Sequence, residues 1–519
     1  MISLKSLRRP KGRAFSNNTD EAGSINGSGS FNSDLLKGDL FCHLTYMSAI
    51  ATSNLSRNLL FEYAAKLAYN SSKYFRKVQY MAKKLNYDYT EACRIVGEST
   101  KETEPKAILL RMSGALASGE NESDFLARES ASMSEVFGDE YERSLESLRK
   151  WTDAYVAVII SASLVVVVSV VSMLIFPMNT SSIALMTFLM LATTLAGAWI
   201  MYRSSPKEIK TIASSDTSAA QNLAKRLFKF VTIPLLIVVV LAMFVLHMDL
   251  GVFMILCGVV AIPPGLIIIM DDRKIDKYDE DIAGFLRSLG GITKAIGSTV
   301  NEALGRLDYG ALGSLKKPVK TLNKSISLGM RPDYCWQRFV NSMGSEHVNR
   351  TVRIFWDSLQ LGGDPLKVGN LSAMFGQKVA LMRAKRRLVA STFSFTSLLI
   401  HGTIAALLVG IYQILLNFSK LLQTADVSKD GMEGLAQLPT FQFFSNSGAS
   451  LQMLNFMVTA MLIMLTIVNA FTIKTVEGGH NLKICFYMGL TLIISGLVMV
   501  ALPGLLSGVF GAIGAVPTN

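Results

Sequence analysis

Long apolar runs separated by short polar links dominate the hydropathy pattern of the chain. An α-helix rises 1.5 Å per residue, so about 20 apolar residues cross the hydrocarbon of a bilayer. Runs of about this length lie at 154–176, 182–202, 230–246, 250–270, 388–417, 451–473 and 484–510. The pattern therefore predicts a polytopic membrane protein with about seven transmembrane helices.

The polar segments carry the period of amphipathic helices. In the first of them, apolar residues recur at helical spacing at Leu55, Leu59, Ala64 and Leu67, without strand-like alternation. The pattern predicts an all-α fold with two repeated cytoplasmic helical bundles. The predicted order is a disordered lead at 1–33, a first cytoplasmic helical domain at 34–153, four transmembrane helices at 154–270, a second cytoplasmic helical domain at 271–387, three transmembrane helices at 388–510 and an external tail at 511–519.

The second polar segment repeats the plan of the first. Ser118-Gly119-Glu120 is matched by Gly362-Gly363-Asp364, and other similarities keep an offset near 244 residues. In each copy a helix ends at a Gly turn, and an acid stands near the positive end of the next helix. Asp364 can also cap a helix that begins at Pro365. The acids Glu120 and Asp364 are either helix-terminal residues or markers of a docking surface, and the sequence leaves both interpretations open.

The net charge of +12 is distributed asymmetrically along the chain. The links 177–181 and 247–249 hold no Lys or Arg, whereas segment 203–229 holds six. Because Lys and Arg stay on the cytoplasmic side, the distribution predicts a multi-pass protein of the cell membrane with a cytoplasmic N-terminus and an extracellular C-terminus. The basic residues that flank the fifth span are interpreted as topological signals that meet lipid headgroups, namely Arg383, Lys385, Arg386 and Arg387.

A second basic cluster lies farther from the predicted spans, at Lys316, Lys317, Lys320 and Lys324. This cluster is either a docking site for an acidic partner or the solvated face of a helix, and both interpretations remain open. Aromatic platforms do not alternate with its lysines, so nucleic acid is not an expected partner.

Residue patterns for catalysis and for metal binding are missing from the sequence. There is no GxxxxGK[ST] or HExxH motif, and the five cysteines form no CxxC pair and are expected to be free thiols. The sequence therefore predicts no metal and no cofactor. The spans also lack acidic and basic residues away from their ends, which disfavours a transporter that couples to ions.

A few residues within the spans allow more than one interpretation. His401 either bonds to a neighbouring helix or relays protons. Pro263-Pro264 is either a hinge or the stop signal of a helix. Gly504 and Gly508 form a GxxxG pattern that permits close helix packing.

Several stretches of the first half resemble one family of membrane proteins. They are LTYMSAIATSNLSRNLLFEYAA, KYFRKV, AKKLNYDYTEACRIV, LLRMSGALASGE, FLARES and YERSLESLRKWTDAYVA. Together they extend from Leu44 to Val158 and resemble the platform proteins of the archaellum, the archaeal flagellum, within the wider type II secretion system F family. The second polar segment follows the same plan more loosely, so the resemblance covers most of the chain.

The resemblance implies a membrane platform that is not an enzyme. Such a platform, a dimer or larger, binds a separate hexameric cytoplasmic secretion ATPase and passes its motion to pilin (archaellin) subunits that enter a filament. The family's charged cytoplasmic loops for the ATPase would correspond to 271–281, with Arg273 and Lys274, and to 315–324, with the four lysines. The alternatives are a platform of another archaeal type IV pilus or secretion system and, in a different class, a polytopic transporter.

Overall fold

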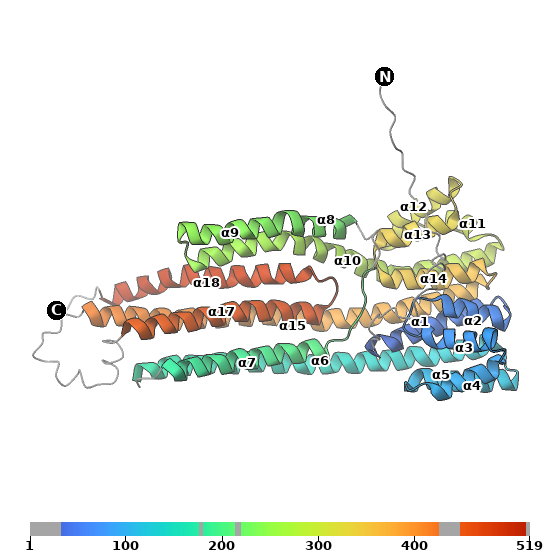
Figure 1. The fold of residues 1–519 in the computed structure, drawn as a ribbon. Helices are drawn as coiled ribbons and strands as arrows, with labels where there is room; N and C mark the ends of the chain where they lie inside the picture. Colours follow the sequence, from blue (N-terminus) through green and yellow to red (C-terminus); the bar gives the residue numbers. More distant parts are fainter. Residues whose placement is uncertain (1–32, 176–179, 213–218, 425–446, 515–519) are drawn as a thin grey trace, which may run out of the picture. The chain divides into compact units, whose positions relative to one another are not determined.

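The computed structural model describes residues 33–175, 180–212, 219–424 and 447–514. Every regular element in these ranges is a helix, apart from an isolated β-bridge between Thr211 and Ser345 (Figure 1). The predicted all-α fold is therefore confirmed for this part of the chain. The predicted lead before Ser33 and the last residues of the predicted tail lie outside the described residues.

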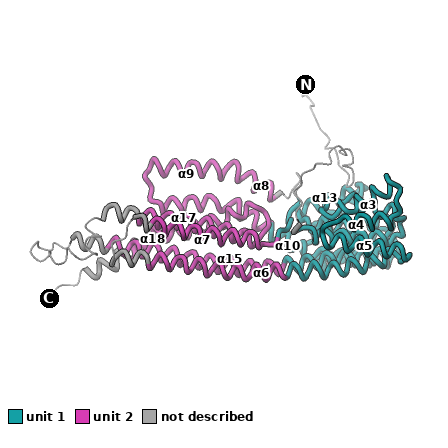
Figure 2. The backbone as a smooth tube through the Cα atoms, turned by 60° about the horizontal axis from the view of Figure 1, so that its bottom comes forward, with its two compact units in different colours: residues 1–142, 207–219, 272–383 teal, residues 143–206, 220–271, 384–519 magenta. Residues whose placement is uncertain are grey.

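The chain forms two compact units (Figure 2). The first, which we call the helical unit, comprises residues 1–142, 207–219 and 272–383. The second, which we call the membrane unit, comprises residues 143–206, 220–271 and 384–519. Three long helices contribute residues to both units, namely α6 (Glu122–Ile175), α10 (Leu250–Ile296) and α15 (Pro365–Thr424).

Two sets of short helices build the helical unit. The first set is α1 (Ser33–Ala51), α2 (Arg57–Lys66), α3 (Ser72–Lys84), α4 (Tyr89–Ser99) and α5 (Thr103–Ser118), followed by the start of α6. The second set follows the end of α10 and is α11 (Val300–Gly305), the 3₁₀ turn η2 (Gly313–Leu315), α12 (Lys316–Ser327), α13 (Pro332–Met343) and α14 (Glu346–Gln360), followed by the start of α15.

The helix starts repeat along the chain. The matching starts are Ser72 and Lys316, Tyr89 and Pro332, Thr103 and Glu346, and Glu122 and Pro365, at intervals of 243 or 244 residues. The two sets share one hydrophobic core, in which Phe41 of α1 lies against Phe375 of α15 with ring centroids 5.0 Å apart. Both segments expected to be separate helical domains are thus parts of one compact unit.

The turn before α6 and the turn before α15 correspond through their glycines. Gly119 and Gly362 both have positive φ, 72° and 86°, a conformation that glycine adopts without steric cost. Two residues later, Asn121 accepts a hydrogen bond from the backbone of Ser123, and Asp364 accepts one from the backbone of Leu366. The counterpart of Asp364 is therefore the helix cap Asn121. Glu120, which the sequence comparison aligned with Asp364, occupies the other position between the glycine and the cap.

The membrane unit contains the spans. Its helices are parts of α6, α10 and α15 together with α7 (Thr180–Ser204), α8 (Ala219–Leu227), the π-helical turn η1 (Phe228–Thr232), α9 (Ile233–Leu246), α17 (Ser447–Glu477) and α18 (Lys483–Gly514). Among the described residues, seven helices are long and apolar enough to cross a membrane, as predicted. Helix α10 continues through Pro263 and Pro264, so the interpretation of this pair as a stop signal is wrong.

Glycines at intervals of seven residues bring α10 and α18 into close contact. A Cβ atom at Gly258 would lie 2.6 Å from the carbonyl oxygen of Gly489, and one at Gly496 would lie 2.6 Å from that of Gly251. Backbone atoms fill this space, so no side chain fits at these positions. A Cβ atom at Gly504, by contrast, would meet no heavy atom within 4 Å. The close packing of α10 against α18 therefore uses these glycines. The surroundings of Gly508, the second glycine of the predicted GxxxG pair, lie outside the described residues.

Candidate functional site

An extended segment, residues 207–212, lies on the second set of helices in the helical unit, and we call it the strap. It belongs to the connection that follows α7. Its backbone is fixed at two points: Glu346 N donates to the carbonyl of Lys210 at 3.1 Å, and Ile212 N donates to the carbonyl of Gly344 at 3.2 Å. The sequence marked this region only as a polar loop with topological charges. The structure shows that its first residues are held in place.

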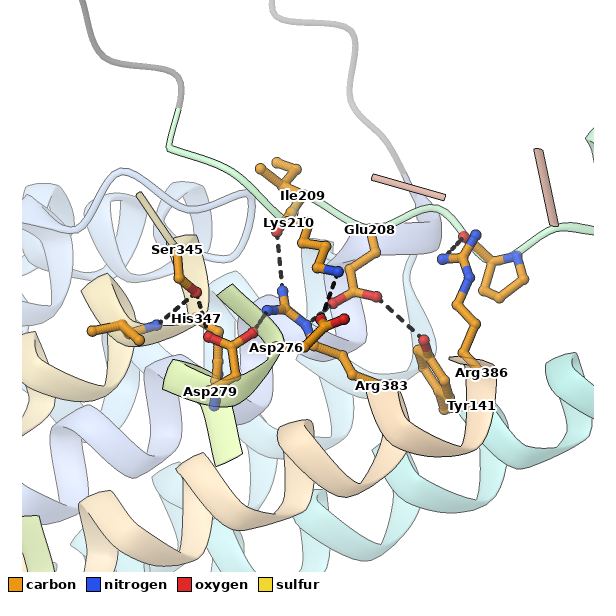
Figure 3. A network of polar contacts seen from close by, with 12 residues as sticks. Tyr141, Glu208, Ile209, Lys210, Asp276, Asp279, Ser345, His347, Arg383 and Arg386 are labelled. Carbon is orange, nitrogen blue, oxygen red and sulfur yellow. Dashed lines mark hydrogen bonds and ion pairs between the residues drawn. The ribbon is translucent and has the colours of Figure 1, made fainter. Parts of the chain in front are cut away.

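Arg383 of α15 lies at the centre of the polar contacts that hold the strap (Figure 3). Its guanidinium forms ion pairs with Glu208 of the strap and Asp279 of α10, and donates to the carbonyl of Ile209 at 3.3 Å. Tyr141 of α6 donates to Glu208 at 3.2 Å. One guanidinium thus joins the strap to two long helices, and its acceptor Glu208 also binds the third.

Lys210 of the strap lies half-buried beside two acids of α10. Lys210 Nζ lies 2.9 Å from Asp272 and 2.6 Å from Asp276. Burial alone favours the neutral amine, but the two carboxylates outweigh burial and raise the pKa of Lys210. The ammonium group therefore stays charged, and moving the strap away would strand buried charges. Removing one partner of such a pair costs about 3–5 kcal/mol.

His347 of α14 lies close to the same contacts (Figure 3). Burial, and then the positive charge of Arg383, holds the pKa of His347 well below its usual value. The neutral ring lies with Nε2 3.0 Å from the carbonyl oxygen of Gly376, which makes Nε2–H the donor. The surroundings of the strap thus combine paired charges with a neutral imidazole. This arrangement is suited to fixing several elements together.

A second buried polar cluster joins the two sets of helices. Arg350 of α14 donates to Asp39 of α1 at 2.7 Å and lies over the ring of Tyr69 at 4.6 Å. Tyr46 of α1 donates to Asp357 of α14 at 3.2 Å. Asp39 and Tyr46 are almost completely buried. These contacts fix α1 against α14 with a defined register.

Asp39 also belongs to a repeated device that sequence reasoning missed. Its carboxylate accepts from the backbone of Asn70, two residues before α3. Asp281 of α10 accepts from the backbone of Ser314 at 2.7 Å, two residues before α12. In the sequence each acid lies far from the residue whose backbone it binds, but each is followed by a similar pattern of apolar residues. An alignment of these two patterns would have matched Asp39 with Asp281.

The predicted docking residues lie on exposed helix surfaces. The four lysines of the 316–324 cluster are all exposed on α12, and in the described part of the chain no acid forms an ion pair with them. Arg273 and Lys274 are exposed on α10. Both regions expected to be charged loops are therefore largely helical. Their role in docking remains a prediction.

The predicted repeat acids differ in what they contact. Asp364 caps α15 through the backbone of Leu366 and Lys367 and forms an ion pair with Lys294 at 2.7 Å. Glu120 forms an ion pair with Arg128 instead. Asp364 is therefore a helix cap, as its sequence predicts.

The four membrane-flanking basic residues differ in their exposure. Arg383 and Arg386 bind protein groups, and Arg386 donates to the carbonyls of Pro206 at 2.8 Å and Val476 at 3.2 Å. Lys385 and Arg387 are exposed. Contact with lipid headgroups stays a prediction for this second pair.

His401 belongs to a buried polar network inside the membrane unit. Its Nε2 lies 2.8 Å from Ser495 of α18, and its Nδ1 lies 3.1 Å from the amide nitrogen of Asn469 of α17. Tyr155 of α6 donates to Asn469 at 3.0 Å. The interpretation of His401 as a bond to neighbouring helices is therefore confirmed, and the network joins four helices.

The thiols and the acids provide no metal centre in the described ranges. No group of three His, Cys, Asp or Glu residues there is arranged to hold a metal ion. All five cysteines are free, as predicted, and four of them are buried. The arrangement can fix helices and segments together, and it presents basic surfaces.

Two curated archaeal proteins resemble the chain over most of its length. The Flagella accessory protein J of Methanocaldococcus jannaschii is 23% identical over 425 residues, which cover 79% of this chain and 73% of that protein. The Flagella accessory protein J of Methanococcus voltae is 21% identical over 436 residues, which cover 82% of this chain and 76% of that protein. No protein-family model and no solved structure matches the chain. Along about four fifths of its length the chain is thus similar to archaeal Flagella accessory protein J, which confirms the resemblance to archaellum platform proteins that its sequence carries.

Proposed function

We propose that this multi-pass membrane protein is the platform on which an archaellum is assembled. The similarity to Flagella accessory protein J along about four fifths of the chain carries the proposal. The seven candidate spans and the compact helical unit are consistent with a platform that has a part in the membrane and a part outside it.

The finer proposal is that the platform couples a cytoplasmic secretion ATPase to the insertion of archaellin subunits. The hexameric ATPase would bind the helical unit, and archaellin subunits and lipid would contact the membrane unit of a homodimeric platform. The orientation that supports this arrangement has the N-terminus in the cytoplasm and the C-terminus outside. The platform itself would not hydrolyse ATP.

The strap provides a physical route for such coupling. Glu208 and Lys210 are bound by residues of α6, α10 and α15, which are the helices that contribute to both units. Because these contacts are buried and charged, a displacement of one element carries its partners with it or breaks ion pairs at high cost. Motion imposed on the helical unit would therefore be passed to the strap and to the helices α6, α10 and α15.

A deletion strain complemented with variants tests the proposal. We expect the strain without the gene to accumulate archaellin in its membrane but to form no archaella, as seen by electron microscopy and swimming assays. The wild-type gene and Lys106→Met, which changes an exposed residue outside the strap contacts, should restore filaments. Arg383→Met should restore few or none at an equal membrane level of the protein, because it removes the cation at the centre of the strap contacts.

Two results would contradict the proposal. Normal swimming together with loss of adhesive pili in the deletion strain would point to a different type IV pilus machine. ATP hydrolysis by the purified chain, retained after all other proteins are removed, would show that the platform is an enzyme.

A further inference from the structure

Helices α3 and α12, which correspond in the two sets of the helical unit, are basic and free of acids. Helix α3 reads SKYFRKVQYMAKK and helix α12 reads KKPVKTLNKSIS. At the repeat interval, Lys73 matches Lys317 and Arg76 matches Lys320. The sequence reasoning singled out only the cluster on α12. The structure shows that the same surface occurs twice.

Several of these cations are exposed and form no ion pair in the described ranges. They are Arg76, Lys77 and Lys84 on α3, and Lys316, Lys317, Lys320 and Lys324 on α12. Lys83, by contrast, forms an ion pair with Glu62. Each helix therefore presents unneutralised positive charge.

An exposed leucine stands at the end of both helices. Leu85 follows α3 and is 53% exposed, and Leu328 follows α12 and is 72% exposed. Each is followed by a residue with positive φ, Asn86 at 54° and Gly329 at 78°. The chain thus turns sharply behind the leucine in both copies. Both helices thus carry an exposed apolar side chain beside their cations.

Exposed tyrosines lie close to both leucines in the sequence. Tyr80 and Tyr87 lie near Leu85 in the sequence, and Tyr334 lies near Leu328. Their exposed fractions are 60%, 43% and 45%. Tyrosine is enriched in protein interfaces, where its ring provides contact area at a small loss of conformational entropy.

The apolar faces of both helices argue against a membrane surface as the binding partner. A helix that binds the lipid interface inserts its apolar face among the acyl chains. In α3 that face is buried in the protein core through Phe75 and Val78, and in α12 through Val319 and Leu322. What remains exposed is a row of cations with one apolar tip, which fits an acidic protein surface with a shallow apolar recess.

We propose that the two surfaces are equivalent docking sites for the same acidic protein surface, used twice by each chain. Corner A comprises Arg76, Lys77, Lys84 and Leu85, and corner B comprises Lys317, Lys320, Lys324 and Leu328. A duplicated site fits a partner that presents several copies of one surface, as a homo-oligomer does. The inference rests on the proposed function for the identity of that partner, the hexameric secretion ATPase.

The test measures binding of the purified ATPase from the same organism to the full-length chain in nanodiscs of uncharged lipid. One variant carries Arg76→Glu, Lys77→Glu and Lys84→Glu, a second carries Lys317→Glu, Lys320→Glu and Lys324→Glu, and a third carries all six changes. The matched control carries Lys101→Glu, Lys106→Glu and Lys367→Glu, three exposed cations outside both corners and outside segment 271–281. Thermal unfolding followed with a thiol-reactive dye checks that each variant is folded.

We expect each single-corner variant to lose affinity about tenfold and the six-residue variant about a hundredfold, because two sites engage one oligomer. The control should bind like the wild type. A pair of neutral changes, Leu85→Ser and Leu328→Ser, should increase the dissociation rate about tenfold without changing the salt dependence.

Three outcomes would overturn the inference. Unchanged affinity in the six-residue variant would exclude both corners, and full loss from corner B with none from corner A would exclude their equivalence. Vesicles with anionic lipid that bind the wild type but not the six-residue variant, while ATPase binding is unaffected, would identify lipid as the partner. If the wild type does not bind the ATPase at all, the coupling in the proposed function fails together with the inference.

Discussion

The ion pair between Asp39 and Arg350 predicts how strongly the two sets of helices depend on one buried contact. Asp39→Asn keeps the size of the side chain and removes its charge. In the structure one carboxylate oxygen lies 2.7 Å from Arg350 Nη1. The other accepts from the backbone and the side chain of Asn70. The amide that replaces the Asp39 carboxylate has only one acceptor oxygen. Its NH₂ group must therefore face another donor, either the guanidinium of Arg350 or the N–H groups of Asn70.

The magnitude follows from what remains around Arg350. Breaking a buried ion pair by removing one partner costs about 3–5 kcal/mol. Arg350 keeps Glu346 at 3.0 Å and its position over Tyr69, which reduces the expected cost to about 2–3 kcal/mol. Since about 1.4 kcal/mol corresponds to a factor of ten, the open population should rise about 30- to 150-fold.

Cys42 reports that opening directly. Its side chain is completely buried three residues after Asp39, and burial raises the pKa of its thiol to about 12, so the folded protein shields it from thiol reagents. We expect Asp39→Asn to accelerate labelling of Cys42 in the full-length chain in detergent by the factor above. A double-mutant cycle with Arg350→Met isolates the energy of the pair.

The matched control is Glu62→Gln. Glu62 forms ion pairs with Lys66 and Lys83 at the protein surface, where such pairs contribute about 1 kcal/mol or less, so labelling of Cys42 should change little. Labelling of Asp39→Asn within threefold of the wild type, or strictly additive effects of Asp39→Asn and Arg350→Met, would refute the reasoning.

Three further predictions concern acid, helix caps and helix packing. Burial, and then the charge of Arg76, lowers the pKa of His43 to about 3, and burial lowers the pKa of His347, so both rings stay neutral in the folded state. The unfolded state takes up protons below about pH 6.5, so the free energy of unfolding should fall by about 1.4 kcal/mol per pH unit for each ring as the pH drops from 6 to 5. The double change His43→Asn with His347→Gln should flatten this fall in urea titrations. Asp364→Ala should destabilise the helical unit by about 1 kcal/mol through loss of its cap, whereas Glu120→Ala should change stability by less than about 0.5 kcal/mol, and equal effects in hydrogen exchange would contradict the assignment of the cap. Gly258→Leu should lower the thermal stability of the detergent-solubilised chain by several degrees, and Gly504→Leu should leave it unchanged, because only the first side chain would meet backbone atoms of α18.

The sequence by itself determined the elements that depend on local chemistry. The lengths of the apolar runs identified the seven spans, since the thickness of a bilayer sets the length of a helix that crosses it. Asp364 was recognisable as a cap because a cap bonds to backbone groups two or three residues away. The family resemblance came from stretches that could be compared without any structure.

Only the tertiary structure decided which distant elements meet. Asp39 and Arg350 are 311 positions apart, and Glu208 and Arg383 are 175 positions apart. Hydrophobic periodicity shows which face of a helix is apolar, but it does not show which other helix covers that face. The two basic surfaces on α3 and α12 became equivalent only when the turns behind Leu85 and Leu328 were compared. A solvated lysine and a lysine that is half-buried beside two acids, as Lys210 is, look the same in a sequence, because their difference lies in the residues that the fold brings around them.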